Sequence, residues 1–269
     1  MSNESSSKSQ EMSFWGHLDV LRGVLFRIVA VTLIFAIGFF ICMNWLFDNI
    51  ILAPCSEDFP LYKLFDYIIS SFSADTSTTS DFKVNLINIK LASQFFIHIS
   101  TSFWLAIICA FPFIIYQLWG FISPALYEHE KRGIRPAFIF GNIMFFIGVS
   151  IGYFLVFPLT LRFLADYQLS ESIANTISLE SYMDNFFVIT FMMGVVFELP
   201  LLAWLLGKMG LLYRNFFSKY RRHAVVVLLI IAAMITPTGD PFTLSAVFFP
   251  IYLLWELSSR LVPKKEIIQ

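Results

Sequence analysis

Charged side chains are scarce in this sequence of 269 residues: Asp, Glu, Lys and Arg make up 14% of it. About 25% is usual for a soluble domain. Hydrophobic residues make up 58% of the chain, and its mean hydropathy is +0.74. This composition excludes a soluble globular protein and a disordered one. The net charge of −1 contains no excess that would indicate a nucleic acid partner.

Cysteine is also scarce, and three residues do not make a disulfide framework. The sequence contains no H-E-x-x-H pattern, no cysteine pair and no glycine-rich phosphate loop. It therefore predicts no metal site, no nucleotide site and no other cofactor.

Long apolar runs are abundant, and about 20 helical residues suffice to span a bilayer core. Four runs of that length and two shorter ones predict spans at about 23–47, 95–119, 137–161, 182–207, 223–236 and 242–258. Prolines within these runs should bend or end their helices. The clearest of these kinks are expected at Pro112 and Pro200. The predicted fold is an all-α integral membrane protein, whose six transmembrane helices are bent by prolines into a concave bundle.

The basic residues predict the orientation of these spans. Fourteen Lys and Arg residues fall on the side of the two termini, and four fall on the other side. The positive-inside rule therefore places both termini in the cytoplasm. The predicted organisation is a tail with an interfacial helix at 1–22, a transmembrane domain at 23–260 with an outer loop at 48–94, and a tail at 261–269.

Glu198 is an acidic residue inside the fourth run, about 14 Å from the cytoplasmic end. An ionised carboxylate there costs roughly 2.5–3.5 kcal/mol on insertion scales, and intramembrane acids are functional candidates by default. Glu198 is therefore a candidate contact for a partner or substrate, or a proton site. The alternative is a structural role, in which a protonated Glu198 bonds a carbonyl freed by Pro200.

Two cytoplasmic segments carry further candidates. The stretch 120–135 packs Glu128 and Glu130 beside two bases, and its apolar residues hold these acids near the membrane plane. A carboxylate there can bind a guanidinium bidentately, although the stretch also fits a plain solvated loop. The stretch 13–22 has the apolar spacing of an interfacial helix with Asp19 on its polar side, and a plain surface anchor is the alternative.

The stretch Gly148–Gly152 matches the G-x-S-x-G pattern of serine hydrolases, with Ser150 as the nucleophile and His98 at similar depth. That motif requires a sharp turn, whereas this match lies inside an unbroken helix pattern. The same residues form G-x-x-x-G, a helix-packing pattern. We therefore expect packing and no intramembrane protease.

From about Ser13 to Arg260 the sequence resembles the TatC family, the multispan receptor of the twin-arginine protein translocase. The most specific segments are Phe111-Pro112 and the stretch 116–132. Phe197-Glu198-Leu199-Pro200 resembles the family's fourth-span signature, and Thr236-Pro237 with Asp240 resembles the turn between its two short spans. The family motif H-L-x-E-L-R reads here His17–Arg22, with Val20 in place of the Glu and an acid one residue earlier.

The resemblance implies a non-enzymatic receptor in the bacterial inner membrane. Its cytoplasmic acidic patch would bind the twin-arginine signal peptides of folded proteins through Glu130 and Phe121, with Asp19 or Glu128 as the second acid. It would assemble with itself, with membrane lipid and with TatA- and TatB-type single-span proteins, and the proton motive force would drive export. Glu198, Thr236 and Asp240 would be its intramembrane polar contacts.

A proton-coupled transporter of small solutes, with Glu198 as its proton carrier, is the alternative function. Broken helices and an intramembrane acid suit such a protein. The sequence contains no convincing internal repeat, however, and many transporters are built from such repeats.

Overall fold

The computed structural model describes residues 14–64, 67, 84–122, 134–168, 170, 175–236 and 240–263. The α-helices and strands are α1 (Phe14–Leu46), β1 (Leu86–Ile87), α3 (Ser93–Ile122), α5 (Ile134–Ile151), α6 (Phe157–Asp166), β2 (Ile177–Ser178), α7 (Leu179–Val196), α8 (Leu199–Lys208), α9 (Arg214–Lys219), α10 (Arg221–Ile235) and α11 (Pro241–Leu261). Short π-helical turns at Phe47–Ile51 and Gly152–Val156 and a 3-10 turn at Ala53–Cys55 complete the helical segments. Helices therefore dominate the described part of the chain, as its apolar runs predicted.

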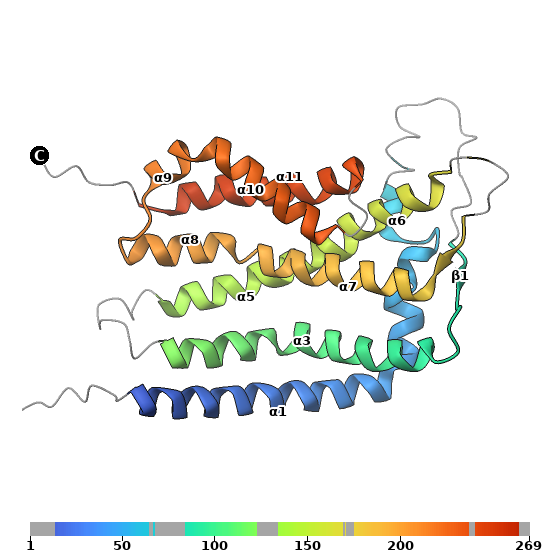
Figure 1. The fold of residues 1–269 in the computed structure, drawn as a ribbon, viewed down its shortest axis with the longest axis horizontal. Helices are drawn as coiled ribbons and strands as arrows, with labels where there is room; N and C mark the ends of the chain where they lie inside the picture. The colour runs from blue at the N-terminus through green and yellow to red at the C-terminus, as the bar shows by residue number, and fades with distance from the viewer. Residues whose placement is uncertain are drawn as a thin grey trace, which may run out of the picture.

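The long helices lie side by side in one bundle (Figure 1). The helix α1 packs along α3, α5 packs along α7, and α11 contacts both α8 and α10. The first residues of α1 and the last residues of α11 lie at the same end of the bundle, on the left in Figure 1. We call this the terminal end, and the end that carries β1 and α6 the opposite end.

Five helical stretches among the described residues are long and apolar enough to cross a membrane. They are Leu18–Ile41, Ser93–Phe121, Phe138–Asp166, Leu179–Lys208 and Pro241–Leu261. The helix α10 has 15 residues and is shorter than these spans, whereas α11 has 21 residues and extends beyond the predicted run at 242–258. The helix predicted at 13–22 is continuous with the first span as part of α1.

The prolines act in two ways. Pro112 and Pro250 lie inside α3 and α11, which continue past them. Pro158 and Pro200 lie in the first turns of α6 and α8, where proline is common. The prolines therefore lie at the start of a helix at two positions and within a helix at two others.

At the opposite end, tyrosine hydroxyls bind backbone carbonyls that Pro54 leaves without helical partners. Pro54 has no N–H to donate to Ile50, and the N–H of Cys55 bonds Leu52 instead of Ile51. Tyr153 donates to the Ile50 carbonyl at 2.8 Å, and Tyr182 donates to the Ile51 carbonyl at 2.5 Å. The irregular end of the first span is thereby tied to the third and fourth.

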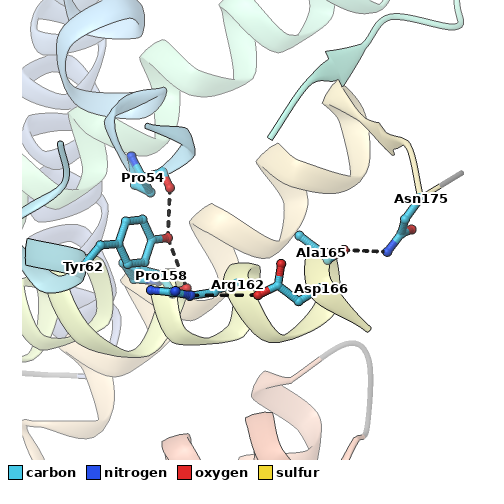
Figure 2. Close-up of polar contacts among 7 residues, drawn as sticks. All are labelled: Pro54, Tyr62, Pro158, Arg162, Ala165, Asp166 and Asn175. Atoms are coloured by element: carbon cyan, nitrogen blue, oxygen red, sulfur yellow. Dashed lines mark hydrogen bonds and ion pairs between the residues drawn. The ribbon is translucent and has the colours of Figure 1, made fainter. Parts of the chain in front are cut away.

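Tyr62 extends this network, as Figure 2 shows. Its hydroxyl donates to the carbonyl of Pro54 at 3.0 Å and lies 3.3 Å from that of Pro158 in α6. The guanidinium of Arg162 lies over the Tyr62 ring, 5.5 Å from its centroid. Asn175 donates to the Ala165 carbonyl at 3.1 Å, near the end of α6. Side chains from three segments thus hold the opposite end together.

Replacing Tyr182 with phenylalanine should lower the stability of the purified protein. The Ile51 carbonyl is buried, and an unsatisfied buried acceptor costs about 1–3 kcal/mol. We expect a lower midpoint of thermal unfolding in detergent. Tyr167→Phe is the matched control because Tyr167 is 63% exposed. Equal midpoints for the two variants would show that the hydroxyl of Tyr182 contributes nothing.

Residues 84–91, in the last part of the outer loop predicted at 48–94, contain a short strand. Their apolar spacing from Val84 to Leu91 fits a strand or a surface helix, and the structure shows the strand β1 paired in parallel with β2. Nearby, the Lys90 ammonium lies 2.7 Å from the Glu180 carboxylate, which links this segment to α7. The segment is therefore fixed to the opposite end of the bundle.

Candidate functional site

The predicted signal-binding residues that the structure describes come from two helices at the terminal end. Asp19 lies near the start of α1 and is exposed. Phe121 lies in the last turn of α3 and is half-buried. The start of α1 and the end of α3 lie side by side at this end (Figure 1). Glu128 and Glu130 lie outside the described residues.

The two helices that flank the loop acids in the sequence have their nearer ends at the same end of the bundle. The helix α3 ends at Ile122 and α5 begins at Ile134, both at the terminal end (Figure 1). The described helix ends on either side of positions 123–133 therefore lie at the same end of the bundle as Asp19 and Phe121.

Glu198 lies where the fourth span is interrupted. The helix α7 ends at Val196 and α8 begins at Leu199, so Glu198 occupies the break just before Pro200. The residue is 8% exposed, and its Oε1 atom is buried without a hydrogen-bond partner among the described residues. Within the described part of the chain, Oε1 therefore forms no hydrogen bond to a carbonyl freed by Pro200.

Gly141 in α5 provides the space for this carboxyl group. A Cβ atom at Gly141 would lie 2.9 Å from Glu198 Oε2 and 2.4 Å from Leu201 Cδ2. Both distances are shorter than a van der Waals contact, so a larger residue would displace Glu198. The role of Gly141 is not evident in the sequence, because no periodic pattern links positions 57 residues apart. The one feature of the sequence that indicated close packing here was a glycine within an apolar run.

Thr236 and Asp240 form local contacts at helix ends. The Thr236 hydroxyl donates to the Ala232 carbonyl at 2.9 Å, where α10 ends. Asp240 caps α11: its Oδ1 atom accepts from the Thr243 N–H at 2.8 Å, and Oδ2 accepts from the Thr243 hydroxyl at 2.5 Å. Both residues therefore stabilise the helix ends on either side of positions 237–239.

The G-x-S-x-G match is a packing face, as the sequence indicates. A Cβ at Gly148 would lie 2.6 Å from the Met193 carbonyl oxygen, and one at Gly152 would lie 2.9 Å from Thr190 Cα. Ser150 donates to the Phe146 carbonyl of its own helix at 2.7 Å, and His98 bonds the Phe40 carbonyl at 3.0 Å. Neither side chain is aligned for nucleophilic catalysis.

Among the described residues, no group of three or more His, Cys, Asp or Glu side chains could hold a metal ion. The two described acids of the site differ in their surroundings: Asp19 is exposed near the start of α1, and Glu198 is buried at the break between α7 and α8. The arrangement suits the recognition of a cation near the membrane surface and a polar contact within the membrane.

Residues 16–250 match the family model described as "Sec-independent protein translocase protein (TatC)". The TatC protein of Blattabacterium sp. subsp. Periplaneta americana is 33% identical over 254 residues, covering 94% of this chain and 95% of that protein. The TatC protein of Deinococcus radiodurans is 38% identical over 177 residues, covering 65% of this chain and 64% of that protein.

Solved structures of TatC proteins are also similar to this chain. A crystal structure described as the twin arginine translocase receptor TatC superimposes with a TM-score of 0.70 at 30% identity, covering 91% of this chain and 97% of that chain. A second structure of such a receptor, in DDM, gives a TM-score of 0.73 at 29% identity. The predicted all-α membrane fold and the non-enzymatic role are thus confirmed, and a translocase subunit is favoured over a solute transporter. This multi-pass membrane protein belongs to the TatC family of Sec-independent protein translocase proteins.

Proposed function

We propose that this protein is the receptor of a twin-arginine translocase and binds signal peptides at the terminal end of its bundle. The site would consist of Glu130 and Glu128 in the segment 123–133, Phe121 at the end of α3, and Asp19 at the start of α1. One observation supports this most: the start of α1 with Asp19, the end of α3 with Phe121 and the start of α5 lie at the same end of the bundle (Figure 1).

Carboxylates at this position suit a pair of arginines. The guanidinium group is planar and binds a carboxylate through two parallel hydrogen bonds, whereas the lysine ammonium is a point charge. Two acids held by different segments can therefore favour two arginines over two lysines. Val20 occupies the position where the family has its glutamate, so Asp19 or Glu128 would supply the second carboxylate.

Glu198 would serve a second step of translocation, the docking of a partner helix within the membrane. Its buried carboxyl lies in a break between two helices and has an oxygen without a described partner. Such a group can accept a hydrogen bond from a polar side chain on an incoming helix. We propose TatA- and TatB-type single-span proteins as the source of that helix, self-association of the receptor in the same complex, and the proton motive force as the energy source.

The excess of basic residues on the side of both termini supports a cytoplasmic position for the terminal end. The signal peptide would then approach from the cytoplasm, and the network around Tyr62 and Tyr182 would face the other compartment. The bacterial inner membrane is the membrane that fits this orientation and family.

Site-directed photocrosslinking tests the location of the peptide site. A photoreactive residue at Phe121 should crosslink a radiolabelled twin-arginine signal peptide in membranes. The same residue at Gln94 is the matched control, since it is exposed at the other end of α3, about 40 Å away. Crosslinking at Gln94 and none at Phe121 would contradict the proposed location.

A further inference from the structure

A group of basic side chains surrounds the short helix α9 at the terminal end. Lys208 ends α8, Arg214 and Lys219 begin and end α9, and Arg222 lies in the first turn of α10. All four are exposed. We call these four residues the basic rim. They are not part of the proposed peptide site, which other segments form.

The basic rim has no counter-ions within the described part of the chain. The sequence contains no Asp or Glu between positions 199 and 239, so neighbouring residues supply none. Glu256 of α11 is the nearby carboxylate that the structure describes, and it forms its ion pair with Arg221. Arg221 also donates from Nε to the Tyr252 hydroxyl at 3.1 Å. None of the four cations of the basic rim therefore has an ion-pair partner among the described residues.

The surface that carries the basic rim is preformed. Phe217 of α9 is buried, and its ring lies 4.7 Å from that of Trp255 in α11. The N–H of Arg214 donates to the Pro263 carbonyl at 3.1 Å. These contacts fix α9 against the end of the chain that includes α11, so Arg214 and Lys219 project from a packed element.

Exposed apolar side chains lie among these cations. Leu211 is 67% exposed, Met209 48%, Phe216 42% and Tyr220 39%. The Lys208 ammonium lies 4.7 Å from the Trp204 ring centroid, and the Lys219 ammonium lies 5.6 Å from that of Tyr220. Aromatic and aliphatic groups interleaved with cations are typical of a surface at the boundary between headgroups and acyl chains.

We propose that the basic rim binds anionic phospholipids of the adjoining leaflet. Lipid phosphates would neutralise Lys208, Arg214, Lys219 and Arg222, and acyl chains would cover the exposed apolar groups. A phosphate on a free, soluble molecule would satisfy only the cations. A twin-arginine peptide is repelled by the same charge, so this surface would leave the peptide to the acidic site.

Native mass spectrometry of the purified full-length protein tests this proposal. The protein is reconstituted in vesicles of phosphatidylcholine and phosphatidylglycerol and then extracted, and the retained lipids are identified. The wild type should retain phosphatidylglycerol preferentially. The double variant Lys219→Gln, Arg222→Gln should lose this preference by about fivefold for each cation removed. Lys219→Arg, Arg222→Lys keeps the charges and should keep the preference.

The pair Arg221→Gln, Glu256→Gln is the matched control, because it changes the same region without changing the net charge. It should retain as much phosphatidylglycerol as the wild type. Equal retention of both lipids by the wild type, or an unchanged preference in the Lys219 and Arg222 double variant, would overturn the proposal. Displacement of the lipid by glycerol phosphate at similar concentration would also overturn it, because it would indicate a soluble phosphate ligand.

Discussion

Gly148→Val should largely abolish the folded protein. The helices α5 and α7 approach so closely at this point that a Cβ would lie 2.6 Å from the Met193 carbonyl oxygen and 2.7 Å from Phe197 Cβ. Overpacking in a core costs about 1–3 kcal/mol, and a backbone oxygen cannot move aside as a side chain does. We expect little monodisperse protein after detergent extraction and a strongly lowered midpoint of thermal unfolding.

Gly38→Val in α1 is the matched control for this substitution. No atom lies within 4 Å of a Cβ at Gly38, so the larger side chain meets open space there. Its yield and unfolding midpoint should stay near those of the wild type. Equal yields for the Gly148 and Gly38 variants would show that close packing of α5 on α7 does not hold the bundle together.

Glu198→Leu should stabilise the isolated protein and abolish export. Leucine removes the buried oxygen that lacks a described partner, and relief of such a group is worth about 1–3 kcal/mol. The contact that we propose with a partner helix is lost at the same time. We expect a raised unfolding midpoint, together with loss of export of a twin-arginine cargo in cells.

A gain in stability with a loss of activity separates a functional acid from a structural one. A structural Glu198 would give a lowered midpoint instead. Glu198→Gln keeps the shape and the polar atoms but does not exchange a proton, and it should also weaken partner contact or export. Full export by both variants would contradict the proposed role of Glu198.

The lengths of the apolar runs predicted the fold well. Each of the four long runs contains a helix, because the backbone of a lipid-exposed span must satisfy its own hydrogen bonds. The last span was harder to delimit. The helix α11 continues through Ser258 to Leu261, beyond its apolar run, and Ser258 bonds the Leu254 carbonyl of the same helix at 2.7 Å.

The surroundings of the candidate site were less predictable. Glu198 is conspicuous in the sequence because it is an acid in an apolar run. Its contact with Gly141, by contrast, depends on how α5 crosses the break between α7 and α8. The tyrosines that bind the Ile50 and Ile51 carbonyls likewise act over about 100 positions, so no local pattern reveals them.

The central claim is that carboxylates at the terminal end recognise paired arginines. Its most direct test is the affinity of the membrane-embedded protein for a twin-arginine signal peptide and for its twin-lysine version. The wild type should bind the arginine peptide about 10- to 100-fold more tightly, since hydrogen bonds between charged groups contribute about 1.5–3 kcal/mol. Glu130→Gln should lose this preference, and Glu57→Gln, an exposed acid outside the site, should keep it. Equal affinity of the wild type for both peptides would contradict the account.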